Sequence, residues 1–155
     1  MINKKLSYIT YNKKIKFLYF IKKQFEAGLS LFGWEIKSIR FGKINIENSY
    51  IKFKNLNIFL LNLIINPLNN LNNKNIIKLR NIRLLLKKKE IFFLFNKIKK
   101  EGYTIIPLCM YWKKNWIKIN ICLVKGKKKY DKRKNIKEKE WKKKKEFLKK
   151  NLQIQ

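Results

Sequence analysis

Hydrophobic and polar residues alternate along most of the chain upstream of Lys125, which is the spacing expected of β-strands with one buried face. Strands are predicted over residues 17–31, 44–53, 56–65, 103–112 and 116–124. The last two are separated by Lys113-Lys114-Asn115 and form the clearest hairpin. In the second of them, Lys118 lies on the polar face and the alternating isoleucines lie on the other.

Two stretches instead repeat their apolar residues with helical spacing. A short helix is predicted after Gly33, and Gly42 should end it. A longer helix is predicted from about Lys87, and Gly102 should end it. The longer helix has apolar residues at i, i+3, i+4 and i+7, so we expect that face to pack on the core: Ile91, Leu94, Phe95 and Ile98. The Asn-rich residues 66–75 predict a loop.

Two sites predict irregularities within the strands. The backbone can bend or bulge at Ala27-Gly28. Pro107 has no N–H group for a strand ladder, so its strand should lie at an edge or turn this nitrogen outward. Five or six short antiparallel strands with two to three helices predict a mainly β fold, and a small closed barrel of the OB-fold type is the simplest candidate.

The strand pattern ends at Lys125–Arg133, beyond which lysine predominates. We predict a basic N-terminal arm over residues 1–16, one barrel domain over 17–126 and a basic C-terminal tail over 127–155. Within the tail, Asn135–Glu138 resembles a capping box that would open a helix. Repulsion among Lys142–Lys145 should nevertheless leave the tail disordered in the free protein and helical only on an RNA surface.

The net charge of the chain indicates which class of molecule it binds. The chain has 40 Lys and Arg residues against 9 Asp and Glu residues, which gives a formal charge of +31. Such charge is typical of nucleic-acid-binding proteins, and its self-repulsion disfavours the compact state until phosphates neutralise it. An A/T-rich genome would also favour lysine and asparagine codons, but it does not explain the shortage of acids. Anionic membranes and acidic proteins are the alternative partners.

Catalytic chemistry lacks its usual side chains. The chain has no histidine, so neither a Ser-His-Asp nor a Cys-His set can form, and it has no Gly-rich phosphate loop. Cys109 and Cys122 lack CxxC spacing and fall on apolar strands, so we expect buried, reduced thiols and neither a metal nor a cofactor. The apolar runs are too short to span a bilayer and the N-terminus does not read as a signal peptide, which predicts a cytoplasmic protein that is not an enzyme.

Aromatic residues interleaved with cations point to RNA, because unpaired bases stack on aromatic rings while lysines contact phosphates. The candidates are Tyr111, Trp112, Trp116, Tyr130 and Trp141. Packing within the hairpin explains Trp112 and Trp116 equally well, and Lys118 fits a solvated side chain as well as a phosphate contact. Glu26, an acid in a basic chain, should either pair with a lysine or accept a hydrogen bond from a base or a ribose hydroxyl.

Short blocks in both halves of the chain form a series. The first half contains Phe25–Leu29, Gly33–Arg40, Gly42-Lys43 and Asn48–Tyr50. The second half contains Glu101–Thr104, Leu108, Tyr111–Lys113, Lys125–Lys128, Tyr130–Arg133 and Ile136–Glu138. In order and spacing these blocks, which cover most of residues 12–141, resemble the signature blocks of the SsrA-binding protein (SmpB) family, the partners of tmRNA in trans-translation.

The resemblance implies an OB-fold barrel that binds the tRNA-like domain of tmRNA and delivers it to a ribosome stalled without a stop codon. The residues it implies for RNA binding are Asn12, Lys13, Lys14, Glu26, Leu85, Lys118, Lys125, Gly126, Lys127 and Lys128. Those implied to face small-subunit rRNA in the decoding region are Tyr130, Asp131, Lys132 and Arg133. The tail would enter the empty mRNA channel and become helical there, with the protein acting as a monomer. The family's Arg-x-Arg-Lys contact is Arg80–Arg83 here, one basic residue fewer.

Two other functions fit parts of the sequence. A small basic ribosomal-type protein that binds rRNA nonspecifically would share the size, the charge and the barrel. A cationic protein of membrane surfaces would need a tail with one apolar face, which Lys142–Lys145 interrupts. A preference for a tRNA-like domain over random duplex at raised salt distinguishes trans-translation from nonspecific rRNA binding.

Overall fold

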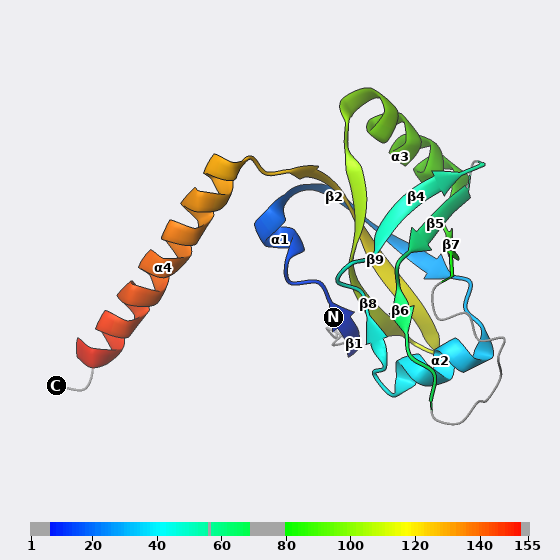
Figure 1. The fold of residues 1–155 in the computed structure, drawn as a ribbon, viewed down its shortest axis with the longest axis horizontal. Coiled ribbons are helices and arrows are strands. Elements are labelled where there is room, and N and C mark those ends of the chain that lie inside the picture. Colours follow the sequence, from blue (N-terminus) through cyan, green and yellow to red (C-terminus); the bar gives the residue numbers. More distant parts are fainter. Residues whose placement is uncertain (1–6, 56, 69–79, 153–155) are drawn as a thin grey trace, which may run out of the picture.

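The structure is a computed structural model that describes residues 7–55, 57–68 and 80–152 (Figure 1). Its strands are β1 (Ser7–Tyr11), β2 (Tyr19–Leu29), β3 (Ile44–Asn45), β4 (Tyr50–Lys54), β5 (Asn57–Leu61), β6 (Ile64–Ile65), β7 (Ile82–Leu85), β8 (Thr104–Lys113) and β9 (Trp116–Gly126). Its helices are α1 (Ile15–Leu18), α2 (Gly33–Arg40), α3 (Lys88–Glu101) and α4 (Lys129–Leu152). No helix among the described residues is long and apolar enough to span a membrane.

One antiparallel sheet of seven strands, in the order β1-β8-β9-β2-β7-β5-β4, forms the body of the protein. The long strand β2 pairs with β9 along most of its length and with β7 at its end, so it joins the two halves of the sheet. The outer strand β4 packs against β8, which curls the sheet into a barrel (Figure 1). The predicted mainly β antiparallel fold is confirmed.

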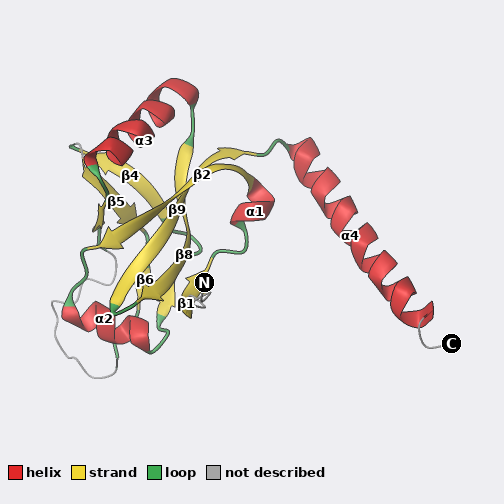
Figure 2. Ribbon diagram, turned by 180° about the vertical axis from the view of Figure 1, so that it is seen from behind, coloured by secondary structure: helices red, strands yellow, loops and turns green. Residues whose placement is uncertain are grey.

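The main core fills the barrel with aliphatic side chains from both halves of the sheet and from α3, including Ile58, Leu60, Leu94, Ile119 and Leu123. Four alternate residues of β9 are buried there, as their alternation predicted: Ile117, Ile119, Ile121 and Leu123. Helices α2 and α3 lie at opposite ends of the barrel (Figures 1 and 2).

A second apolar cluster lies on the other face of β8 and β9, where Ile15 of α1 packs. Cys109 and Cys122 belong to this cluster, and both are free, buried thiols, as expected. Burial raises the pKa of Cys122 to about 11, so this thiol stays protonated at neutral pH and is a poor nucleophile.

Both predicted barrel helices are confirmed, and a glycine follows each one. Gly42 (φ +70°) and Gly102 (φ +66°) adopt the left-handed conformation that ends a helix. The predicted apolar face of α3 is only partly core: Leu94 is buried, whereas Phe95 is 37% exposed. The reason is its position, since Phe95 meets the outer β4–β5 hairpin through Phe53 instead of the barrel interior.

The strands depart from the predictions in several places. The strand β7 was not predicted, and the predicted strand 44–53 is broken between β3 and β4 by a turn at 46–49. The bulge in β2 lies between Ile21 and Lys23, not at Gly28, where β2 instead passes from β9 to β7. Pro107 is not on an edge strand, because β8 lies between β1 and β9; it lies just beyond the end of the ladder with β1, which reaches Cys109.

Both terminal segments contain regular secondary structure within the described residues. Residues 7–11 of the predicted arm form β1, which pairs with β8. The tail forms α4, which projects away from the barrel (Figure 1) and begins at Lys129, six residues before the predicted cap at Asn135. The earlier start has a local cause, because the Asp131 carboxylate accepts a hydrogen bond from the Lys128 N–H group (3.2 Å) at the helix N-terminus. Disorder of the tail in the free protein stays a prediction. The predicted loop 66–75 lies mostly outside the described residues.

Candidate nucleic-acid interface

Glu26, Leu85 and Lys118 line one groove, although they come from three different strands. The ladders place Gly28 opposite Lys118 of β9 and opposite Leu85 of β7. Glu26 precedes Gly28 by two residues and therefore lies on the same face of β2. The groove, here named the β2 groove, has a volume of about 510 Å³ and is lined by Glu26, Gly28, Leu85, Leu86, Lys87, Glu90 and Lys118.

Leu85 gives the β2 groove an exposed apolar wall. The alternation along β7 buries Ile82 and Leu84 and turns Leu85 outward, leaving it 55% exposed. The absence of a side chain at Gly28 permits the close approach of β7, because a Cβ atom there would lie 3.3 Å from the Leu85 Cβ atom. An exposed leucine beside a carboxylate and an ammonium group offers a partner both apolar and polar contacts.

The Glu26 carboxylate is held by two side chains of β8. It accepts a hydrogen bond from the Tyr111 hydroxyl (2.5 Å) and two from the Lys113 ammonium group (2.8 and 3.0 Å). The hydrogen bonds from Lys113 and then Tyr111 lower the pKa of Glu26, so the group is ionised at neutral pH. Of the two roles predicted for Glu26, the structure shows the lysine pair. The carboxylate is still 38% exposed, so it has room to accept a further hydrogen bond from a ligand.

A second cationic surface, here named the α1 surface, surrounds α1 and the end of β9. It contains the predicted residues Lys13, Lys14, Lys125, Gly126, Lys127 and Lys128. Lys127 joins its two parts, donating from its backbone N–H to the Leu18 carbonyl (3.0 Å) and from its ammonium group to the Lys16 carbonyl (3.0 Å). Helix α1 and strand β7 lie on opposite sides of the barrel (Figures 1 and 2), so the structure separates the predicted RNA-binding residues into two surfaces.

Asn12 is the one predicted RNA-binding residue that the fold buries almost completely, with 2% of its surface exposed. Its side-chain amide donates to the Glu47 carbonyl (3.2 Å), and its side-chain oxygen accepts from the Lys14 N–H group (3.1 Å). These bonds fix the turn that presents Lys13 and Lys14 to solvent. The Lys14 ammonium group also pairs with the exposed Glu47 carboxylate (2.6 Å).

The predicted stacking residues divide by exposure. Trp116, Tyr130 and Trp141 are exposed, whereas Tyr111 is buried with its hydroxyl on Glu26. Trp112 is half-buried against the core, with the Arg40 guanidinium 5.8 Å from its ring centroid. The hairpin-packing interpretation therefore holds for Trp112 and not for Trp116. The predicted ribosome-facing residues Tyr130, Asp131, Lys132 and Arg133 form the first turn of α4.

Arg80, which lies in the segment that matches the family's Arg-x-Arg-Lys contact, is partly buried and paired within the protein. Its guanidinium donates to both carboxylate oxygens of Glu35 (2.7 and 2.6 Å) and to the Ser30 carbonyl (2.8 Å). Glu35 is 1% exposed, so this is a buried ion pair. Sequence reasoning missed the pair because its partners are 45 residues apart and on separate elements. Tyr111 and Lys113 were likewise not predicted as partners of Glu26.

Comparison with known proteins places this geometry in a family context. The family model described as SmpB protein matches residues 9–151, which include the barrel and almost all of α4. A solved structure described as "tmRNA-SmpB: a journey to the center of the bacterial ribosome" is similar to this chain with a TM-score of 0.64 and 31% sequence identity. The similarity covers 82% of this chain and 93% of the other.

Proposed function

The chain belongs to the SmpB protein family, and from this membership we propose that it binds the tRNA-like domain of tmRNA and delivers it to stalled ribosomes in trans-translation. The observation that carries the proposal is the family match over residues 9–151, because it includes both candidate RNA surfaces and the tail. We propose that the protein acts in the cytoplasm as a monomer and by binding alone, without catalysis.

The β2 groove and the α1 surface take different roles in this function. The β2 groove offers Glu26, Leu85 and Lys118, whose mixed chemistry suits recognition of a folded RNA. The α1 surface offers lysines that contact phosphates regardless of sequence. A barrel that binds RNA on opposite sides can hold the tRNA-like domain on one face and ribosomal RNA on the other.

The tail is the part of the protein that detects an empty mRNA channel on the ribosome. Residues 142–145 are consecutive lysines, so an isolated helix there is weakened by like-charge repulsion. Phosphates of an unoccupied mRNA channel would neutralise these charges and favour the helix seen as α4. A channel filled with mRNA would exclude the tail, and vacancy itself therefore becomes the signal.

Competition binding at raised salt should show a strong preference for the tRNA-like domain of tmRNA over random duplex RNA. Nonspecific phosphate contacts weaken with added salt, with a slope of about −0.7 to −0.9 per neutralised phosphate, whereas shape-specific contacts persist. Equal affinities at every salt concentration would instead support the nonspecific ribosomal-type protein.

Glu26→Ala should weaken binding of the tRNA-like domain by about tenfold or more, even though it makes the protein more positive. The reason is that a hydrogen bond to a charged group contributes about 1.5–3 kcal/mol and that the loss also releases Lys113 and Tyr111 from their positions. Filter binding or fluorescence anisotropy would measure the change. The matched control is Glu101→Ala, which removes an exposed acid from the end of α3 and should bind as the unmodified protein does. Tighter binding by Glu26→Ala would show that net charge alone sets the affinity.

A further inference from the structure

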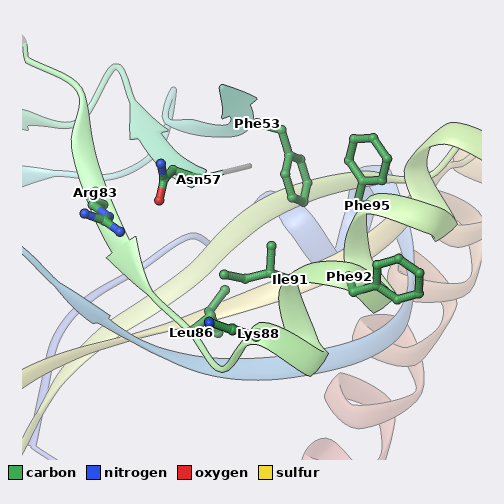
Figure 3. A pocket seen from close by; sticks show the side chains of 8 residues that line it. All are labelled: Phe53, Asn57, Arg83, Leu86, Lys88, Ile91, Phe92 and Phe95. Atoms are coloured by element: carbon green, nitrogen blue, oxygen red, sulfur yellow. The ribbon is translucent and has the colours of Figure 1, made fainter. Parts of the chain in front are cut away.

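A second groove lies beside the β2 groove, between α3 and the β4–β5 hairpin. Its lining comes from β4, β5, β7 and α3, together with Leu86, which directly follows β7. Figure 3 shows the lining residues: Phe53, Asn57, Arg83, Leu86, Lys88, Ile91, Phe92 and Phe95. Its volume of about 570 Å³ lies within the range of about 300–1,000 Å³ typical of small-molecule sites. We name it the α3 groove. Leu86 lines both grooves, so the two are adjacent.

Phenyl rings form one wall of the α3 groove. Phe53 and Phe95 meet edge to face with their centroids 5.6 Å apart, and Phe92 lies one turn before Phe95 on α3 (Figure 3). Phe92 is 69% exposed, which is unfavourable for an apolar side chain in water. A flat, apolar partner that covers these rings would remove that cost.

Two cationic side chains also line the α3 groove. Arg83 faces outward from β7, and Lys88 begins α3. Neither has a carboxylate partner among the described residues. Asn57 adds a side-chain amide, whose nitrogen donates to the Asn55 carbonyl (3.1 Å) and whose oxygen is an acceptor. Rings, unpaired cations and an amide together match the π-face, the phosphate and the edge of a nucleotide.

We propose that the α3 groove binds one unpaired nucleotide of the RNA whose folded body lies in the β2 groove. The base stacks on the rings of Phe92 and Phe95, and its phosphate lies against Arg83 and Lys88. This inference rests on the proposed function, because it extends that RNA-binding surface through Leu86.

Charge selects RNA over the other occupants of an apolar groove. An apolar protein segment would cover Arg83 and Lys88 without neutralising them, and a buried unpaired charge is costly. A second copy of this chain would bring its own formal charge of +31, so repulsion opposes that contact. A nucleotide satisfies both the rings and the cations.

Phe92→Ser is expected to lower the affinity for the tRNA-like domain of tmRNA by about 5- to 150-fold, the usual effect of losing one stacked base. Because stacking releases no counterions, the salt dependence of binding should not change. Arg83→Gln should also weaken binding, and it should reduce the salt slope by about 0.7–0.9. A tRNA-like domain carrying 2-aminopurine at single unpaired positions should show quenching at one position, and Phe92→Ser should abolish that quenching.

The matched control is Phe41→Ser. Phe41 is 72% exposed, close to the 69% of Phe92, but it follows α2, which lies at the other end of the barrel (Figure 1). Its substitution should therefore leave the RNA affinity unchanged.

Glu26→Ala serves as the reference for the β2 groove. If Glu26→Ala weakens binding while Phe92→Ser and Arg83→Gln bind as the unmodified protein does, this proposal is wrong and the proposed function stands. If the unmodified protein shows no preference for the tRNA-like domain, both are wrong. Loss of self-association in Phe92→Ser with unchanged RNA affinity would assign the groove to a second copy instead.

Discussion

Glu35→Ala should lower the free energy of unfolding by about 3–5 kcal/mol, a large share of the stability of a small domain. The Glu35 carboxylate accepts two hydrogen bonds from the Arg80 guanidinium (2.7 and 2.6 Å) and one from the Phe32 N–H group (2.7 Å). Its removal leaves the Arg80 charge, which is 19% exposed, without a carboxylate partner. It also leaves the Phe32 N–H group, at the start of α2, without the acceptor that the Glu35 carboxylate provides in the unmodified protein.

Urea unfolding followed by circular dichroism would measure this loss. Glu101→Ala is the matched control, since it also breaks a pair with a lysine, Lys97, but at an exposed position of α3, and it should have a much smaller effect. The double variant Glu35→Leu with Arg80→Met should recover much of the stability, because it leaves no unpaired charge in the protein. A loss as small as that of Glu101→Ala would mean that water solvates Arg80 once its partner is gone.

The Arg80 pair marks one limit of reading this chain from sequence. Asn12 was predicted to bind RNA, and Arg80 lies in the segment that matches the family's Arg-x-Arg-Lys contact. In the structure, Arg80 neutralises a buried acid and Asn12 holds a turn. A buried polar residue and a ligand-binding one have the same side chain, and only the position of a distant partner distinguishes them. The partner of Arg80, Glu35, is 45 residues away.

Local signals predicted the elements that have local causes. Helices α2 and α3 were predicted because each has a helical repeat followed by a glycine that adopts a positive φ. The strand β7 was missed because its four residues lead directly into the predicted helix and are too few to show a clear alternation. Its stability comes from pairing with β2 and β5, which no local pattern contains.

The β2 groove shows the same division between local and distant causes. The resemblance to a family supplied Glu26, Leu85 and Lys118 as residues, but only the register of three strands at Gly28 brings them together. The α3 groove was not predicted at all. Phe95 belongs to a helical repeat that is typical of a core face, and nothing in that repeat indicates that its ring would lie outside the barrel.

Deleting the residues after Lys134 should abolish peptide tagging on stalled ribosomes while leaving affinity for the tRNA-like domain nearly intact. Residues 135–152 of the deleted segment belong to α4, which projects away from the barrel (Figure 1), and these residues are part of neither the β2 groove nor the α1 surface. It removes eight lysines and three glutamates, so most of the positive charge stays with the barrel. Binding assays and a tagging assay with ribosomes on an mRNA without a stop codon would measure the two effects separately.

A helix-breaking variant of the full chain separates the shape of the tail from its charge. Trp141→Pro keeps every lysine but places a proline inside α4, which costs a helix about 3 kcal/mol or more. If the tail must become helical in an empty channel, this variant should lose tagging almost as completely as the deletion. If it tags normally while the deletion does not, the tail acts as a flexible polycation and its helix is unnecessary. Undiminished tagging by the deletion variant would show that the barrel alone directs tmRNA to the stalled ribosome.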